Sequence, residues 1–523
     1  MTMKKYFLLG LLFIGYNSMA QTWSGEVAQI FYNKCTQCHH TGGGAPFSLM
    51  TYQEASPMAA VIAQVVNDNC MPPWPPDNNY QQYQHTRSLS PLDKATLINW
   101  IAINVPEGNA ASTPPPPIYN NNNILGNGDL TIQMPTYMSK ATAMADDYVC
   151  FAIPTNLTQN RIIKAVEVIP GNPDIVHHAL VYYDPTSAEV TDTVGGNCAS
   201  PSNANTKLIT GFTPGATPMI LPSVNPLKMG ITIGAGSQIY LNMHYPDGSY
   251  GLFDSTKVIL HFYPIGTTGV RQVSASPVIA DYMFALPPNQ LTTLAEQYPA
   301  GAAGVPVDLS VISVFPHMHL LGESIKSYAT GPANDTIKFI NIPHWDLHCQ
   351  DFYYFTQLKH LPAGYTIKGE AVYDNTAQNP HNPNSPPQTV TIGYNTTDEM
   401  FIIYFHYMLY QAGDENYDLE ALTSSSLAEY PIGNIGSVVC YPNPMSSNGT
   451  IISLEETIDT KSMIYIYDGK GNLIRKLNFS NLHDATSVFW DGANENNAQV
   501  SPGIYYVSAK ANDKMMAGKL IKH

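Results

Sequence analysis

The sequence predicts a multidomain chain: a small all-α domain, then two all-β sandwiches, then a small β-sandwich domain at the C-terminus. Three observations predict this order. The 523 residues exceed what one hydrophobic core can organise. Only 12% of residues are charged, and the chain contains 33 Tyr and 41 Pro. This composition favours a β-rich exported chain over a helical cytosolic one. The composition also changes at residues 20, 111–123 and 431.

Residues 1–20 are predicted to be a cleaved signal peptide. Lys4 and Lys5 form a basic start, a short apolar stretch follows, and Ser18 and Ala20 occupy the −3 and −1 positions of a cleavage site. The apolar stretch is too short to span a bilayer, so a membrane anchor is the less favoured alternative. We therefore expect an exported chain. Its net charge of −16 argues against a nucleic-acid partner.

Residues 21–110 are predicted to form the all-α domain. SPLDKATLINWIAINV opens with Ser90 as a helix N-cap, Pro91 at the first helical position and Asp93 three residues after the cap. An earlier helix is indicated by apolar residues on one face, namely Val27, Ile30 and Phe31. Residues 111–123, a polyproline run followed by asparagines, are predicted to be a stiff linker.

KCTQCHH at 34–40 matches C-x-x-C-H, the attachment pattern of c-type haem. Cys35 and Cys38 have the spacing to add to the two haem vinyl groups, and His39 would supply an axial nitrogen. A redox dithiol and half of a zinc site are the alternatives. The sequence holds no second C-x-x-C to complete a four-cysteine zinc site. We therefore predict a cytochrome c domain with one covalent haem.

The second axial ligand of this haem is predicted to be Met71, in the Pro-rich loop DNCMPPWPPD. The domain resembles haem modules that carry an MPPW loop, and this resemblance favours Met71 over its rivals Met50 and Met58. Ligation by histidine and methionine raises a haem potential and suits an electron carrier.

Residues 124–430 are predicted to form two sandwiches, 124–270 and 271–430, without a helix of convincing length. Short β-runs alternate there with Pro, Gly and Asn turns. They are RIIKAVEVIP, HHALVYYD, SQIYLNMHYP, KVILHFYPI, VDLSVISVFPHMHL and MFIIYFHYML. Cys150 and Cys198 are candidates for a disulfide in an exported chain.

Histidine clusters stand out in this β-rich region. The motifs are VHHALVYYD (His177, His178), YLNMHYP (His244), FPHMHLLG (His317, His319) and TTDEMFIIYF (Met400). Imidazoles within apolar runs need partners, which a metal ion supplies. Residues i and i+2 of a strand share a face, so His317 and His319 can meet at one ion, whereas adjacent histidines require a bulge or a strand end. Three histidines alone could hold zinc, but the Met400 thioether favours copper.

In this order the motifs resemble the copper type II ascorbate-dependent monooxygenases, the family of peptidylglycine α-hydroxylating monooxygenase and dopamine β-monooxygenase. Three further stretches are similar: HWDLHCQDFYYF (344–355), YDNTAQNPHNP (373–383) and TTDEM (396–400). The resemblance implies two jelly-roll-like sandwiches, each with one copper ion. It implies an electron-transfer copper on His177, His178 and His244, and an O2-binding copper on His317, His319 and Met400.

The implied reaction is R–H + O2 + 2e⁻ + 2H⁺ → R–OH + H2O on a small organic substrate. The sequence departs from the peptide-hydroxylating member, because Phe315 replaces its substrate-binding arginine and Ile402 replaces an asparagine. Tyr404 is matched and is a candidate substrate contact. A peptidyl-glycine substrate is therefore not expected.

Electrons are expected from the fused haem and its donor, or from ascorbate or a redox protein. One alternative is a non-enzymatic copper- and haem-binding surface protein that transfers electrons. The other is a binding protein with vestigial metal sites.

Residues 431–523 are predicted to form the last β domain, with DGKGN as a hairpin turn. YPNP (441–444), IYDGKGNLI (466–474) and GIYYV (503–507) resemble the C-terminal sorting domain of the type IX secretion system. This resemblance implies the type IX machinery as a partner. It also implies an extracellular or cell-surface location in a Bacteroidota-type cell, or otherwise a periplasmic one. A small immunoglobulin-like binding module is the alternative.

Overall fold

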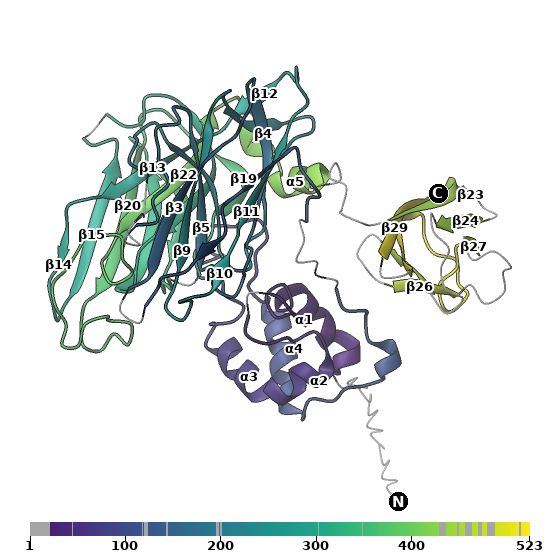
Figure 1. Ribbon diagram of the computed structural model, residues 1–523. Coiled ribbons are helices and arrows are strands. Elements are labelled where there is room, and N and C mark those ends of the chain that lie inside the picture. The colour runs from purple at the N-terminus through teal and green to yellow at the C-terminus, as the bar shows by residue number, and fades with distance from the viewer. Residues whose placement is uncertain are drawn as a thin grey trace, which may run out of the picture. The chain divides into compact units, whose positions relative to one another are not determined.

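The computed structural model describes most of the chain between residues 21 and 522 (Figure 1). The described residues are 21–43, 45–117, 119, 124–142, 145–194, 198, 201–301, 303–347, 349–427, 436–446, 449–454, 463–468, 473–478, 487–511 and 514–522. The predicted signal peptide and residues 469–472 of the DGKGN turn lie outside them. The chain divides into two compact units, which are described separately. Unit 1 comprises the segments up to Thr41, Ala45–Trp74 and Arg87–Tyr119, and unit 2 comprises Gly42–Gly44, Pro75–Thr86 and Asn120–His523.

Unit 1 is helical around an aromatic core. Its elements are the π-helical turn η1 (Trp23–Val27), α1 (Ala28–Lys34), α2 (Tyr52–Ala55), η2 (Ser56–Met58), α3 (Ala59–Asn67), α4 (Pro91–Ala102) and η3 (Ala110–Ser112). The rings of Trp23, Phe31 and Trp100 contact one another in the core. The predicted cap of α4 is confirmed, since the Asp93 amide donates to Oγ of Ser90 at 3.0 Å.

The first sandwich of unit 2 has two main sheets, with strand orders β1-β11-β4-β8-β12 and β3-β9-β5-β6. The strands are β1 (Leu130–Gln133), β2 (Tyr137–Met138), β3 (Asp147–Pro154), β4 (Arg161–Ile169), β5 (His178–Asp184), β6 (Lys207–Phe212), β7 (Met219–Ile220), β8 (Lys228–Ile233), β9 (Gln238–Tyr245), β10 (Phe253–Asp254), β11 (Lys257–Phe262) and β12 (Val270–Gln272). Every residue of β9 is buried, because this strand is central in its sheet and covered on both faces.

The second sandwich has sheets of order β13-β22-β16-β19 and β15-β20-β17-β18 (Figure 1). The strands are β13 (Ser274–Asp281), β14 (Ala285–Leu286), β15 (Leu291–Tyr298), β16 (Leu309–His317), β17 (Gly322–Thr330), β18 (Thr336–Ile342), β19 (Tyr353–Leu361), β20 (Thr366–Asp374), β21 (Val390–Thr391) and β22 (Phe401–Leu409). The sequence pattern did not predict the short helix α5 (Leu419–Leu427) that follows. The prediction of a mainly β-sandwich fold is confirmed.

His406 of β22 joins the two sandwiches. Its Nδ1 accepts from Oγ of Ser313 at 2.7 Å, and its Nε2 donates to the carbonyl of Ile209 in β6 at 2.9 Å. Burial lowers the pKa of His406 to about 4, so the ring is neutral and serves as one donor and one acceptor. The imidazole thereby fixes the β22 sheet against the first sandwich.

A segment from within the predicted all-α domain packs on the second sandwich instead. Residues 75–86, here called the strap, belong to unit 2. Tyr83 is buried, and its hydroxyl donates to the carbonyl of Phe339 at 2.7 Å. The side-chain amide of Gln84 donates to the carbonyl of Phe355 at 2.9 Å. Prolines before the strap prevent helix formation, so its backbone pairs with sheet residues instead.

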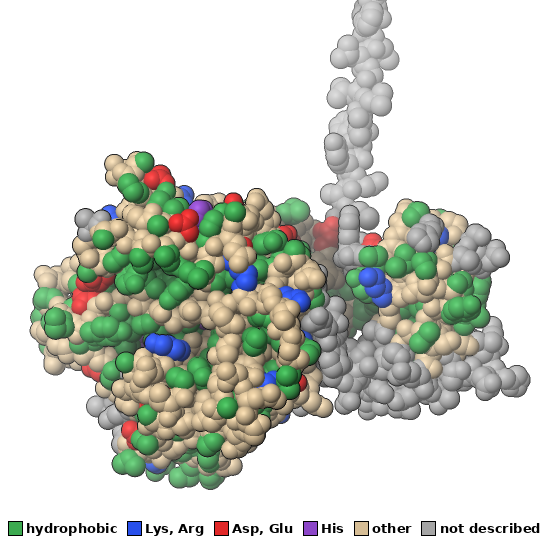
Figure 2. Space-filling view, turned by 90° about the horizontal axis from the view of Figure 1, so that it is seen from above, with side chains coloured by type: hydrophobic (Ala, Val, Ile, Leu, Met, Phe, Trp, Pro, Cys, Tyr) green, Lys and Arg blue, Asp and Glu red, His purple; other side chains and the backbone are tan. Residues whose placement is uncertain are grey.

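The C-terminal module contains seven strands in the order β26-β25-β28-β29-β23-β24-β27. They are β23 (Gly436–Ser446), β24 (Gly449–Leu454), β25 (Met463–Asp468), β26 (Leu473–Asn478), β27 (Ser487–Trp490), β28 (Gly503–Ala511) and β29 (Lys514–Lys522). Trp490, Ile464 and Val507 are fully buried in its core. Among the described residues of the whole chain, no helix is both long and apolar enough to cross a membrane. Figure 2 shows few charged side chains, spread among apolar and uncharged polar ones, on the face in view.

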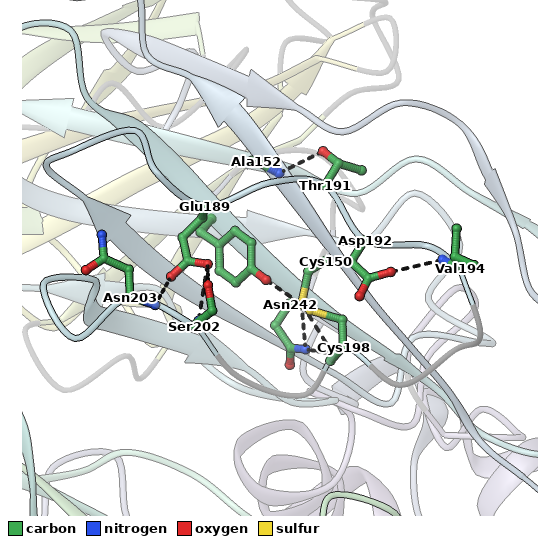
Figure 3. Close-up of a disulfide and its surroundings, with 11 residues drawn as sticks. Cys150, Ala152, Glu189, Thr191, Asp192, Val194, Cys198, Ser202, Asn203 and Asn242 are labelled. Carbon is green, nitrogen blue, oxygen red and sulfur yellow. Dashed lines mark hydrogen bonds between the residues drawn. A yellow bond between two sulfur atoms is a disulfide. The ribbon is translucent and has the colours of Figure 1, made fainter.

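The disulfide between Cys150 and Cys198 is confirmed (Figure 3). It fastens a loop onto β3, where the backbones of Cys150 and Asp192 exchange hydrogen bonds of 2.8 and 2.9 Å. Asn242 of β9 donates from Nδ2 to the carbonyl of Cys198 at 2.6 Å. The loop, the disulfide and the neighbouring strands β3 and β9 therefore form one cross-linked layer.

Replacing both Cys150 and Cys198 with serine should lower the free energy of unfolding of the first sandwich. The disulfide closes a segment with a sequence separation of 48 residues. The expected loss is about 2–4 kcal/mol because the unfolded chain gains freedom. Hydrogen exchange of β3 and β9 in increasing urea measures it. Cys440→Ser, a buried free thiol in the C-terminal module, is the control. Equal protection in the double variant and the wild type would contradict the prediction.

Candidate metal centres

His177, His178 and His244 form the first candidate centre, called site 1. His178 begins β5 and lies opposite His244 of β9, and the His177 amide donates to the His244 carbonyl at 3.0 Å. Nδ1 of His178 lies 3.2 Å from Nδ1 of His177 and 3.2 Å from Nδ1 of His244. One ring nitrogen from each residue falls within 4.8 Å of the others. The strand end, rather than a bulge, lets adjacent histidines face one point.

The surroundings of site 1 orient its rings. The Tyr148 ring stacks on His244 with centroids 4.2 Å apart and planes 6° apart. Oδ2 of Asp146 lies 3.0 Å from Nε2 of His244, and Oγ1 of Thr396 donates to the same Oδ2 at 2.7 Å. A carboxylate at Nε2 leaves the Nδ1 lone pair directed at the other two rings.

Burial, together with neighbouring imidazoles, holds the pKa of His178 well below its usual value. Burial raises the pKa of Asp146, but contacts with His244 and Thr396 outweigh this and lower it. A neutral His178 ring close to an ionised Asp146 carboxylate has the protonation states that metal binding requires. Site 1 therefore fits a copper ion, as Cu(I) or Cu(II), or a Zn(II) ion.

His317 and His319 form the core of the second candidate centre, called site 2, with their Nε2 atoms 3.2 Å apart. β16 ends at His317, so the expectation of a strand running through His319 is wrong. The cause is Glu399, whose carboxylate accepts from the amides of His319 at 2.9 Å and Leu321 at 2.6 Å. Those amides leave the sheet ladder, and the chain turns with both imidazoles still facing each other.

Partners on the far side of each imidazole fix the tautomers of site 2. Nδ1 of His317 contacts Oε1 of Gln350 at 2.5 Å, and Nδ1 of His319 contacts the carbonyl of Asp398 at 3.1 Å. Because both partners are acceptors, each Nδ1 donates and each Nε2 lone pair is available to a metal ion. Burial lowers the pKa of His319 to about 3. Sequence reasoning missed Gln350, although it lies in the stretch HWDLHCQDFYYF.

Glu399 is a buried carboxylate that sequence reasoning treated only as a neighbour of Met400. Burial raises its pKa to about 8, while the amides of His319, Leu321 and Met400 lower it. Its oxygens bond to backbone, so the residue shapes the loop and is not directed at site 2.

Met400 lies immediately before β22, and its carbonyl accepts from the Tyr373 hydroxyl at 2.7 Å. Its side chain borders the same cavity as His317 and His319. Two imidazoles and one thioether are soft and borderline ligands, which fit copper better than zinc.

One cavity of about 370 Å³ borders both centres. Its wall includes His178 from site 1 and the three site 2 residues, together with Phe315 and Tyr404. A molecule in this cavity would contact both centres. Both sandwiches contribute to the wall, so the cavity exists only where they meet.

Comparison with known families covers part of this architecture. Residues 278–431 match the family described as "Copper type II ascorbate-dependent monooxygenase, C-terminal domain". This stretch contains His317, His319 and Met400, so it supports copper as the metal of site 2. Residues 445–514 match "FlgD Ig-like domain", which agrees with the immunoglobulin-like alternative for the C-terminal module. A comparison with curated proteins gives no match.

Solved structures similar to parts of the chain include PorZ of Porphyromonas gingivalis, an essential surface component of the type IX secretion system. It has 18% identity and a TM-score of 0.14, over 24% of this chain and 15% of PorZ. A β-glucuronidase of Faecalibacterium prausnitzii has 11% identity and a TM-score of 0.14, over 69% and 46% of the two chains. Latent PorU of P. gingivalis has the same identity and TM-score, over 72% and 34%. The chain spans less than half of each, and these scores support no inference.

The C-x-x-C-H motif lies in unit 1, in the turn that follows α1. The amide of His39 donates to the Cys35 carbonyl at 3.0 Å, which brings the motif into one turn. Nδ1 of His39 contacts the Phe47 carbonyl at 3.0 Å, so Nε2 is the atom with an available lone pair. Cys35 packs against the apolar core. These positions fit a covalent haem, which remains a prediction.

The three candidate methionines for the second axial position differ in exposure. Met71, in the loop after α3, is 41% exposed, whereas Met58 packs against the core of unit 1. Met50 is half-buried. His40 has its own partners, a Tyr119 ring 4.1 Å away and the Thr36 carbonyl at 2.8 Å.

Asp146→Asn should weaken copper binding at site 1. An amide cannot hold the Nε2 proton of His244 as a carboxylate does, and loss of such a partner lowers metal affinity about 10- to 100-fold. The measurement is a competition titration with a copper chelator, in a His317→Ala/His319→Ala background that isolates site 1. Asp174→Asn, an exposed acid of the same sandwich, should leave the affinity unchanged. Unaltered affinity in Asp146→Asn would show that the contact does not orient His244.

Proposed function

We propose that this protein is an exported copper-dependent monooxygenase that hydroxylates a C–H bond of a small organic substrate with O2. One observation carries the proposal: two clusters of converging imidazole nitrogens, one on each sandwich, border a single cavity. The family match over residues 278–431 supports the same chemistry.

Each cluster would hold one copper ion through a different ring atom. At site 1, the Nδ1 atoms of His177, His178 and His244 converge. At site 2, the Nε2 atoms of His317 and His319 converge, with the Met400 thioether beside them. When bound, copper supplies one-electron redox chemistry and O2 activation.

The protein's own residues orient the ligands and shield the reaction from water. Gln350 and the Asp398 carbonyl hold the site 2 imidazoles by Nδ1, so the rings do not rotate when a ligand enters. Phe315, Ile402 and Tyr404 line the cavity beside site 2. Their apolar surface leaves less room for water that would otherwise compete with the substrate.

The proposal includes a c-type haem on Cys35, Cys38 and His39, with Met71 as the candidate second ligand, which would supply electrons in place of or beside ascorbate or a redox protein. Export through a signal peptide and delivery to the cell surface by the type IX machinery are parts of the same proposal, which rest on sequence motifs alone. The immunoglobulin-like match of the C-terminal module is compatible with a sorting or binding role.

Met400→Leu keeps side-chain volume but removes the sulfur. We expect the copper(I) protein to lose sulfur scattering in X-ray absorption, and substrate-coupled O2 uptake to fall by about tenfold or more, or 1.4 kcal/mol in the barrier. Met408→Leu, a buried change in the strand β22 that follows Met400, is the matched control and should alter neither. Retained sulfur scattering would exclude Met400 as a ligand. Two bound coppers without substrate-coupled O2 uptake would instead favour the non-enzymatic electron-transfer protein.

The copper(II)-loaded protein is mixed rapidly with a reductant that reduces its haem. The haem should then be reoxidised within one molecule. The rate should not depend on protein concentration if the electron moves inside the chain. His177→Ala/His178→Ala, which removes site 1 ligands, should slow this phase, while Met71→Ala should remove the thioether–iron absorption band. Haem that stays reduced in the copper(II) protein would contradict the relay.

A further inference from the structure

We infer that the substrate is an uncharged small molecule that carries a ring and one neutral polar group. This inference rests on the proposed function and names the substrate class of the cavity that borders sites 1 and 2. It follows from the shape, charge and hydrogen-bonding groups of the cavity wall.

Aromatic side chains form the wall beside site 2. The rings of Phe315 and Phe352 stack with centroids 4.5 Å apart and planes 12° apart, and Phe315 is also roughly parallel to the imidazole of His317 at 6.2 Å. The Tyr404 ring lies 6.2 Å from Phe315 at an angle of 44°. All four residues line the cavity. Flat apolar faces bind ring compounds through offset stacking and burial of apolar area.

Charged groups are scarce in this wall. Apart from the histidines, the charged side chains among the described lining residues are Lys207 and Asp351. Lys207 is exposed and donates to the carbonyl of Ala204 at 3.0 Å. Asp351 accepts from the amide of Phe352 at 2.8 Å. Neither charge belongs to the aromatic part of the wall, so an ionised group held against those rings would lose hydration there, which is unfavourable.

Two tyrosine hydroxyls are among the neutral polar groups of the cavity wall. Tyr182 and Tyr404 are hydrogen-bonded to each other, and burial raises the pKa of both, that of Tyr404 to about 12. They stay neutral at physiological pH and can each donate or accept one hydrogen bond. Such a pair recognises a hydroxyl, ether, carbonyl or amide group. The volume of about 370 Å³ lies near the lower end for small-molecule sites.

Three matched probes test the charge preference: 2-phenylethanol, phenylacetate and 2-phenylethylamine, which are neutral, anionic and cationic at pH 7. Calorimetric titration of the full chain without copper measures binding to the cavity wall apart from both metal coordination and turnover. We expect the alcohol to bind about tenfold or more tightly than either ion, since an ion loses hydration on entry. An ion that binds as tightly as the alcohol, or a failure of all three to bind, would overturn the inference.

Two variants locate the bound probe. Phe352→Ala removes an aromatic ring and its apolar area from the wall and should weaken alcohol binding about tenfold. Tyr404→Phe keeps the ring but removes the hydroxyl, so alcohol binding should weaken several-fold while binding of ethylbenzene stays the same. Phe489→Ala, an exposed residue of the C-terminal module, is the control and should bind all probes like the wild type. Unchanged alcohol binding in both cavity variants would place the probe elsewhere and overturn the inference.

The two proposals fail in different ways. Selective binding of the neutral probe, without O2 uptake on any substrate, would leave the substrate class standing and contradict the monooxygenase. Substrate-coupled O2 uptake with a preference for an ionic probe would support the monooxygenase and contradict the substrate class.

Discussion

The loop of residues 395–400 holds both candidate metal centres, and the arrangement of the cavity depends on it. Thr396 bonds to Asp146, which in turn contacts His244 of site 1. Two residues later, the Asp398 carbonyl contacts the His319 ring of site 2, and Met400 follows as a candidate ligand. Since Asp146 belongs to the first sandwich and the loop to the second, the link also joins the sandwiches. A shift between them would disturb both sets of imidazoles together.

This loop holds its shape because the buried carboxyl group of Glu399 accepts hydrogen bonds from backbone amides. Glu399 is fully buried and accepts from three amides that would otherwise be unsatisfied. Amides without partners in such an environment are costly, so the loop has few alternative conformations. His406 has a comparable role between the sheets, because its neutral ring bonds to both sandwiches. Buried polar groups that are fully paired thus fix the geometry that the apolar cores alone would leave adjustable.

Much of this arrangement could be predicted from local patterns. Periodicity and turns located six strands of the two sandwiches, namely β4, β5, β9, β11, β16 and β22. Ser90 marked the start of α4, and the disulfide was among the expected pairs. Long-range polar contacts could not be predicted. The end of β16 depends on Glu399, which is 80 residues from His319 in sequence, and the pairing of the strap depends on carbonyls more than 250 residues away. Hydrophobic patterns specify which face of a strand is buried, but they do not specify which distant side chain captures an amide.

The polarity of the cavity wall and the affinity of the metal centres for anions together limit which substrates can bind. An open coordination position on a copper ion attracts anions, and a carboxylate substrate could therefore bind the metal itself and block that position. A neutral ring compound would bind the aromatic wall instead and leave the metal position for O2. Phe315 and Tyr404, which carry no charge, lie beside His317 in the same wall. An apolar surface next to the imidazole nitrogens would thus let one cavity take a neutral substrate and O2 without competition for the metal.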